Sequence, residues 1–256
     1  MPSLPKMQIH RFFLPDAAQR DPLTLSGREA HHALDVMRLR RGDAITLLDG
    51  AGNQFICEIA TTSRERVMLT LKEKKSTPPL PCAVTLLAAI PKGKIEDLIE
   101  KATELGAARI VPLLTERTIV QIKPEEAAGK VEKWRRITSE AIKQCGSPWL
   151  PKIEAPVKLH DYLARRETFE LSLLAALQAD RRQPRDCFAA SRAALGRAPQ
   201  TAAVWVGPEG DFTPEEVAAI RAAGATPITL GPLVLRADTA AIYGLALLNC
   251  EFNAGE

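Results

Sequence analysis

The sequence predicts two domains, a small β-rich domain followed by a larger α/β domain with a mainly parallel sheet. Short apolar runs rich in β-branched residues dominate residues 1–75, and Gly, Asn or Arg turns separate them. Three prolines and a Ser-Thr pair interrupt this pattern at residues 76–82, as in a linker. Over residues 83–256, apolar runs alternate with amphipathic segments, which is the pattern of strands and covering helices.

Local patterns justify each element. Apolar residues at helical spacing predict one short helix within residues 26–43, packed on a small barrel. The barrel strands are expected at 44–50, 54–60 and 66–73, with a turn signal at 49–53. The strands of the second domain are expected at 83–90, 109–114, 171–177, 201–207 and 225–231. Its helices are expected at 93–107, 125–146, 213–224 and 237–252, with a loop and a short helix within 181–200.

Charge and cysteine usage narrow the class of protein. The formal net charge is +3, and residues 1–75 hold 12 Lys and Arg against 9 Asp and Glu, so the excess lies there. This indicates an anionic partner for the N-terminal part. No segment is typical of a membrane span or signal peptide, and the five cysteines lie far apart without metal-ligand spacing. We therefore expect a cytoplasmic protein with reduced thiols, no membrane association and no metal site.

The stretch "VGPEGDFTPEEV" (206–217) joins an expected strand to an expected helix. Thr213 can cap the helix, Pro214 suits its first position, and Glu216 completes a capping box. Ligands bind at the carboxyl ends of strands in open α/β sheets. Four carboxylates in the loop and first helical turn, including Glu209 and Asp211, disfavour a pyrophosphate. A neutral or cationic ligand fits better, such as an adenosine or a sulfonium.

The stretch "ITLGPLVLRADTAAIYG" (228–244) has the same organisation. Gly231 either lets a ligand approach the backbone or permits a turn, and Asp238 or Thr239 is expected to cap the next helix. Each glycine alone is more often structural than functional. Two such loops after successive strands nevertheless indicate a binding site.

Motifs along most of the chain resemble those of one family. They are "GPEGDFTPEE" and "LGPLVLRADTA", with "PKGKIEDLIEKATELGAARIVPLLTERT", "KWRRITSEAIKQCG", "HRFFL" and "HHALDVMRLRRGD". Together they are similar to the bacterial 16S ribosomal RNA uridine-N3 methyltransferases, the RsmE family of the SPOUT superfamily.

The resemblance implies a fold, a reaction and partners. The N-terminal part would be a PUA-like β-barrel that binds RNA, and the C-terminal part a trefoil-knotted domain holding S-adenosyl-L-methionine. The family acts as a homodimer with active sites near the subunit interface. Its target is one uridine in the 16S RNA of the 30S subunit, position 1498 in the usual RNA numbering.

The resemblance also assigns site residues. The cofactor-binding positions would be Leu174, Ala175, Ala176, Gly207, Pro208, Glu209, Gly210, Leu230, Gly231, Leu235, Arg236, Thr239 and Ala240. Leu230 and Leu235 fit plain core packing equally well. The RNA-binding positions would be Arg11, Arg38, Arg40, Arg41, Lys92 and Lys94. An arginine cluster is otherwise a solvated face.

Uridine N3 must lose a proton before or during attack on the methyl group. A general base, or a cation that stabilises the anion forming on the uracil oxygens, would assist. The catalytic candidates are Arg236, Lys92, Glu104 and Arg117, with Lys101 as a further cation. Arg236 is preferred because it lies within the cofactor loop. Glu104 follows Lys101 by three residues, and a structural pair is the favoured interpretation there.

The sequence departs from the family pattern at three places. Asp211 replaces a glycine, which an aspartate tolerates at positive φ less freely. Ala237-Asp238 replaces Thr-Glu, and Ser147-Pro148-Trp149 stands where an arginine usually follows Gly146. Two alternatives remain open: a knotted methyltransferase with another RNA target, and a non-catalytic assembly factor with a degenerate pocket.

Overall fold

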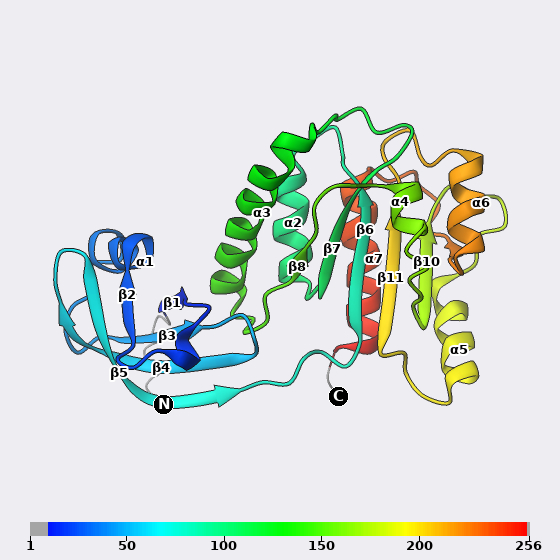
Figure 1. The fold of residues 1–256 in the computed structure, drawn as a ribbon. Helices are drawn as coiled ribbons and strands as arrows, with labels where there is room; N and C mark the ends of the chain where they lie inside the picture. Colours follow the sequence, from blue (N-terminus) through cyan, green and yellow to red (C-terminus); the bar gives the residue numbers. More distant parts are fainter. Residues whose placement is uncertain (1–9, 255–256) are drawn as a thin grey trace. The chain divides into compact units, whose positions relative to one another are not determined.

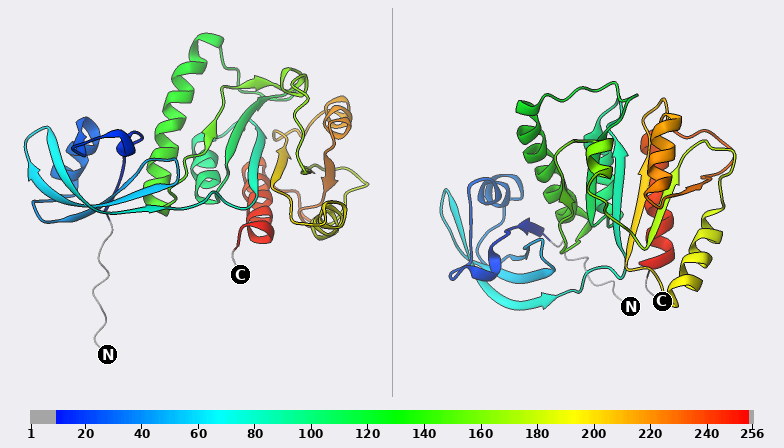
Figure 2. Two further views of the ribbon diagram at one scale, coloured as in Figure 1. Left: turned by 60° about the horizontal axis from the view of Figure 1, so that its bottom comes forward. Right: turned by 45° about the vertical axis from the view of Figure 1, so that its right-hand side comes forward.

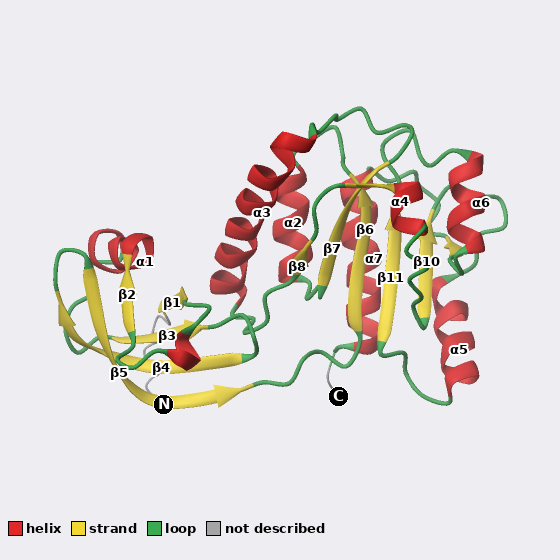
Figure 3. Cartoon of the chain, in the orientation of Figure 1, coloured by secondary structure: helices red, strands yellow, loops and turns green. Residues whose placement is uncertain are grey.

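The computed structural model describes residues 10–254, which divide into two units (Figures 1 and 3). The first unit contains the described residues up to Pro79 together with Ile142–Leu150. The second contains Leu80–Ala141 and the described residues from Pro151 onward. Between the last strand of the first unit and the first strand of the second, residues 77–82 form neither helix nor strand.

The first unit is built on a five-stranded sheet of order β1-β3-β4-β5-β2. Its strands are β1 (His10–Phe13), β2 (Thr24–Ser26), β3 (Ala44–Leu48), β4 (Asn53–Thr62) and β5 (Arg66–Ser76). β1 runs parallel to β3, and the remaining pairs are antiparallel. On β4, Phe55, Cys57 and Ile59 are buried while their neighbours are not, because alternate side chains of a strand face opposite sides.

A short helical segment packs on this sheet, as the spacing of apolar residues predicts. It begins as α1 (Gly27–His31) and continues as a π-helical turn (His32–Val36), with a 3-10 turn at Ala17–Gln19. Ala30 and Ala33 are fully buried against the sheet residues. Strands β3 to β5 lie where the sequence predicts them. The edge strands β1 and β2 were not predicted.

The end of helix α3 (Pro124–Cys145) and the segment that follows it belong to the first unit. The ammonium of Lys143 lies 2.9 Å from a carboxylate oxygen of Glu29, and the Lys143 side chain is only 6% exposed. The guanidinium of Arg11 donates to the backbone carbonyls of Lys143 and Gln144, at 3.4 and 3.3 Å. The Arg11 contacts satisfy carbonyls at the carboxyl end of α3. The Glu29 carboxylate neutralises the buried ammonium of Lys143.

Trp149 follows the end of helix α3 and contacts the segment after β5. Its indole N–H donates to the carbonyls of Thr77 and Pro78, both at 3.1 Å. The ring packs on Gly52, where an added Cβ would lie 2.5 Å from an indole carbon. The Ser147-Pro148-Trp149 departure therefore forms a structural contact within the first unit.

The second unit contains a seven-stranded parallel sheet of order β12-β10-β11-β6-β7-β8, with β9 also paired to β7. The strands are β6 (Ala83–Ala89), β7 (Arg109–Leu114), β8 (Lys152–Ile153), β9 (Val157–Lys158), β10 (Leu171–Ala175), β11 (Thr201–Val206) and β12 (Thr226–Ile228). The other helices are α2 (Ile95–Glu104), α4 (Leu159–Leu163), α5 (Pro184–Leu195), α6 (Pro214–Ala222) and α7 (Ala237–Phe252).

Helices cover both faces of this sheet (Figure 2). Helices α2, α3, α5 and α7 pack on the face that includes Val204, and α4 and α6 pack on the face that includes Trp205. The alternation along β11 explains its continuous apolar run, since both sets of side chains are buried. Helix α7 approaches β11 closely at Gly244, where an added Cβ would lie 2.8 Å from Val204.

The predicted α/β architecture is confirmed, with three local differences. Helix α4 and the two-residue strands β8 and β9 were not predicted. The predicted cap of α7 is wrong: the helix begins at Ala237 after Arg236, and the Asp238 carboxylate accepts only from its neighbour Thr239. The trefoil knot stays a prediction, because strand order alone does not establish threading. Within residues 10–254, no helix has the length and apolar character needed to cross a bilayer.

Candidate functional site

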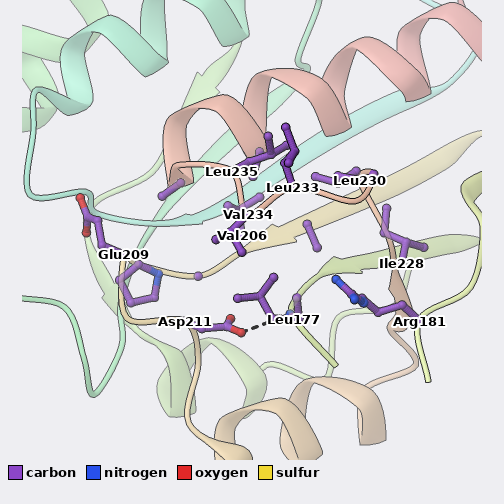
Figure 4. A pocket seen from close by; sticks show the side chains of 17 residues that line it. Leu177, Arg181, Val206, Glu209, Asp211, Ile228, Leu230, Leu233, Val234 and Leu235 are labelled. Atoms are coloured by element: carbon purple, nitrogen blue, oxygen red, sulfur yellow. Dashed lines mark hydrogen bonds between the residues drawn. The ribbon is translucent and has the colours of Figure 1, made fainter. Parts of the chain in front are cut away.

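Five loops of the second unit meet at one edge of its sheet. Strands β6, β7, β10, β11 and β12 are mutually parallel, so their carboxyl ends lie at the same edge. A pocket lies there, lined by the ends of β10, β11 and β12, their loops and the start of α7 (Figure 4). This is the edge where open α/β sheets bind ligands.

The loop after β11 is fixed by close packing and by a capping box. Gly207 is buried, and an added Cβ would lie 3.0 Å from the backbone nitrogen of Phe212. Thr213 Oγ1 accepts from the N–H of Glu216 at 3.2 Å, and Glu216 accepts from the N–H of Thr213 at 3.0 Å. The predicted capping box is confirmed. The loop therefore presents a preformed backbone surface to the pocket.

The carboxylates of this loop bind backbone N–H groups of other loops. Glu209 Oε1 accepts from the N–H of Lys92 at 2.8 Å, and Glu216 Oε1 accepts from the N–H of Glu116 at 2.8 Å. The sequence predicts the capping role of Glu216 but neither of these two contacts with other loops. The two contacts join the loop after β11 to the loops after β6 and β7.

Asp211 connects the loop after β11 to the loop after β10. Its backbone has φ +60°, a left-handed conformation that aspartate tolerates less freely than glycine. One carboxylate oxygen accepts from the N–H of Phe212 at 2.8 Å, and the other accepts from the N–H of Leu177 at 3.2 Å (Figure 4). The Asp211 side chain thus holds two walls of the pocket together.

The loop after β12 supplies a third wall. Gly231 has φ +111°, a conformation that other residues rarely adopt. Leu233 and Val234 line the pocket, yet they are 75% and 76% exposed. Leu230 and Leu235 are half-buried and also line the pocket, so core packing does not fully account for them.

Most of the predicted cofactor positions meet at this pocket. Those that line it are Ala175, Ala176, Gly207, Pro208, Glu209, Leu230, Gly231, Leu235 and Ala240. Those that do not line it are Leu174, Gly210, Arg236 and Thr239. Leu174 is fully buried within the sheet, and the Gly210 carbonyl accepts from Arg117.

Three of the four catalytic candidates lie on loops at the pocket edge. Lys92 donates its backbone N–H to Glu209, Arg117 donates to the Gly210 carbonyl at 2.7 Å, and Arg236 adjoins the lining residue Leu235. Their side chains are exposed.

Glu104 lies apart from these candidates. It is the last residue of α2, which runs back from the loop after β6 toward the start of β7, at the opposite edge of the sheet. Both its oxygens lie 3.1 Å from the Lys101 ammonium. The geometry favours the structural pairing and gives Glu104 no contact with the pocket.

The predicted RNA-binding residues fall into two groups. In the first unit, Arg38, Arg40 and Arg41 are exposed in the turn before β3, and none forms an ion pair among the described residues. Arg11 instead donates to carbonyls at the end of α3. In the second unit, Lys92 and Lys94 are exposed in the loop after β6.

Sequence reasoning missed several residues of the pocket. They are Leu177, Arg181, Leu233 and Val234, and Asp211 was expected as a loop carboxylate but not as a cofactor-binding position. The positions expected in the loop after β10 end at Ala176, and Leu177 and Arg181 lie beyond them. The hydrogen bond from Leu177 to Asp211 spans 34 residues, so no local signal pointed to it.

A separate ionic cluster lies at the start of β7, away from the pocket. The guanidinium of Arg109 pairs with Glu154 at 2.9 Å and with both oxygens of Glu167, and Tyr162 donates to Glu167 at 2.8 Å. The hydrogen bond from Arg109 holds the pKa of Glu167 below its ordinary value. Burial is the main cause that raises the pKa of Tyr162. This cluster fixes the edge of the sheet.

The pocket suits a nucleoside better than a phosphate. Its walls are mostly apolar, with exposed backbone from glycine-containing loops, and the anionic Glu209 and Asp211 are among the lining residues. Among the described residues, no group of three or more His, Cys, Asp or Glu side chains is arranged to hold a metal ion. An adenosine with a positively charged sulfur would meet complementary surfaces.

Two family models match the chain and define its class. An RNA methyltransferase domain matches residues 78–249, and an RNA methyltransferase PUA domain matches residues 25–72. The chain is therefore an RNA methyltransferase with a PUA domain.

Individual relatives identify the family within that class. Ribosomal RNA small subunit methyltransferase E of Synechocystis is 34% identical over 89% of this chain and 72% of its own length. The Bacillus subtilis protein of the same name is 29% identical over 89% and 90%. This chain belongs to the ribosomal RNA small subunit methyltransferase E family.

Solved structures agree with this assignment. A Legionella pneumophila methyltransferase in complex with the bound cofactor SAM has a TM-score of 0.83 at 31% identity, covering 95% of this chain and 98% of that one. Ribosomal RNA small subunit methyltransferase E of Neisseria gonorrhoeae, bound to S-adenosyl methionine, has a TM-score of 0.81 at 27% identity, covering 94% and 97%.

Proposed function

We propose that this protein transfers a methyl group from S-adenosylmethionine to N3 of one uridine in the 16S RNA of the small ribosomal subunit. The observation that carries the proposal is the preformed pocket at the carboxyl edge of the sheet, walled by three loops. Two solved relatives that cover nearly the whole chain hold this cofactor. The curated relatives are named for small-subunit ribosomal RNA methylation.

The residues of the pocket fit the cofactor. Leu230 and Leu235 provide apolar surface for the adenosine, and the open backbone at Gly231 allows it to approach closely. The carboxylates of Glu209 and Asp211 favour a cation over a phosphate. When bound, the cofactor supplies a methyl group that is already strongly electrophilic.

The chain must then bind the uridine and stabilise its loss of a proton. Loss of the N3 proton places negative charge on the uracil oxygens, and a guanidinium or ammonium nearby lowers that barrier. We assign this role first to Arg236 and then to Lys92 and Arg117, because all three adjoin the pocket loops. Glu104 is not retained in this role.

We further propose that Arg38, Arg40 and Arg41 of the PUA domain contact RNA phosphates, together with Lys92 and Lys94. Their exposure and lack of acidic partners among the described residues support this. We place the domain boundaries at 1–75 and 83–256, with a trefoil knot in the second domain. The substrate is the assembled 30S subunit, and the protein acts in the cytoplasm.

Self-association is part of this proposal. Leu233, Val234 and Tyr243 are large apolar or aromatic side chains that remain 75%, 76% and 43% exposed. They lie on the loop after β12 and on α7, and exposed apolar groups of this size are typical of interfaces. A homodimer would cover them beside the pocket.

Methyl transfer to 30S subunits that lack uridine-N3 methylation tests the proposed function. Label from radioactive S-adenosylmethionine should appear as 3-methyluridine. Arg236→Ala should reduce the rate at saturating cofactor and RNA by about 100-fold, comparable to losing one stabilising donor. The exposed Arg185→Ala serves as the matched control. Label in another nucleoside would indicate a different target, and no transfer beside an active family enzyme would refute the assignment.

A further inference from the structure

Arg181 is the single cationic side chain among the described residues that line the pocket. It lies in the loop after β10, and Figure 4 shows it extending toward Leu177. No hydrogen bond or ion pair occupies its guanidinium among the described residues. An arginine without a partner beside a ligand site has five donors available for an anion.

The backbone directly after Arg181 is held by hydrogen bonds to the strand β12 and the residue that follows it. The N–H of Arg182 donates to the carbonyl of Pro227 at 2.9 Å, and the Arg182 carbonyl accepts from Thr229 at 3.0 Å. On the other side, Asp180 pairs with Arg221 of α6 at 2.7 Å. The backbone that carries Arg181 is therefore held beside the pocket, which lowers the entropic cost of ordering the loop when a ligand binds.

The other charged groups of the pocket are already engaged. Asp211 accepts from Leu177 and Phe212, and Glu209 accepts from Lys92. Neither carboxylate lies within ion-pair distance of Arg181. The pocket thus has two anions bound to its own backbone and one cation left for a ligand.

The cofactor has one group that matches this cation. S-adenosylmethionine carries a positive sulfur, a positive ammonium and a single carboxylate at its amino-acid end. We propose that Arg181 binds this carboxylate through a bidentate, charge-assisted pair and so selects the intact amino-acid end of the cofactor. This inference rests on the proposed function, since it specifies one contact of the same site.

A pair of ligands that differ only in the carboxylate tests the assignment. Dissociation constants for S-adenosylmethionine and its decarboxylated form are measured by calorimetry on the full-length protein. Arg181→Gln should weaken S-adenosylmethionine binding by roughly tenfold or more and leave the decarboxylated form unchanged. Arg181→Lys should lie between the two, because it keeps the charge but loses the planar fork.

Arg185→Gln is the matched control, since this exposed arginine of α5 does not line the pocket and should bind both ligands like the wild type. Equal affinity of Arg181→Gln and wild type for S-adenosylmethionine would overturn the inference. Equal weakening for both ligands would also overturn it and assign the side chain to the adenosine. Weaker 30S binding with unchanged cofactor affinity would assign it to RNA. Failure of the wild type to bind S-adenosylmethionine would instead refute the proposed function.

Discussion

Asp211 links two walls of the pocket. Replacing it separates the contribution of its hydrogen bonds from that of its left-handed backbone. Asp211→Ala removes the acceptors for the N–H groups of Leu177 and Phe212 and places an alanine at φ +60°. Asp211→Gly removes the same acceptors but tolerates that φ. Asp211→Asn keeps one acceptor, and asparagine is among the residues that best accept left-handed backbone.

The magnitudes follow from these contacts. Loss of the hydrogen bond to Leu177, which is exposed to water, costs about 1 kcal/mol net. A left-handed alanine costs about 1 kcal/mol more. We therefore expect Asp211→Ala to lower the free energy of unfolding by about 2 kcal/mol, Asp211→Gly by about 1 kcal/mol, and Asp211→Asn by less.

Cofactor affinity should follow the same order, because the loop after β10 is released from the loop after β11. If the closed pocket loses about 2 kcal/mol of stability relative to the open one, the dissociation constant rises by up to about 30-fold, since 1.4 kcal/mol is tenfold. Urea denaturation gives the stability, and calorimetry with S-adenosylmethionine gives the affinity. Wild-type values for Asp211→Ala, or a glycine variant less stable than the alanine variant, would refute the reasoning.

Four further substitutions, one of them a control, test packing and charge. Gly244→Ala places a methyl group against Val204 and should lower the free energy of unfolding by about 1 kcal/mol, measured by urea denaturation. Gly129→Ala has open space around the added methyl group and should raise it by about 1 kcal/mol. Equal effects of the two substitutions would contradict the packing argument. Glu167 has a lowered pKa, so its contribution is full above the ordinary value of 4.5 and is lost as pH falls through its folded pKa. Glu167→Gln should therefore flatten the acid loss of stability, and an unchanged pH profile would rule out this role. Trp149→Ala removes the indole contacts with Thr77 and Gly52 and should lower the unfolding free energy by about 2 kcal/mol, measured by calorimetry. A variant as stable as the wild type would contradict this prediction.

Local patterns were sufficient where an element is long or carries its own cap. The run of β11 and the capping box of α6 depend on neighbouring residues, and both were predicted. Strand β1 was missed because its four residues gain their strand character from parallel pairing with β3, such as Phe12 with Leu47. The cap of α7 was misassigned because polar residues near a helix start also occur inside its first turn.

The sequence predicts the edge of the sheet at which the site lies, but not the contacts that join its loops. Glycine-containing loops after successive strands indicated where a ligand would lie. The partner of the Glu209 side chain, however, is the backbone of Lys92, 117 residues away. Arg181 belongs to no motif, and only the fixed course of the loop after β10 brings it to the pocket.

The participation of Ile142–Leu150 in the first unit has a consequence for folding during translation. A nascent chain that has emerged as far as Pro79 has all five strands of the first sheet, but Glu29 still lacks Lys143, and the carbonyls of Thr77 and Pro78 still lack the indole of Trp149. The N-terminal unit can therefore be completed only after much of the second has been synthesised. A fragment cut at the linker would lack these contacts, because the first unit draws residues from two separate parts of the sequence.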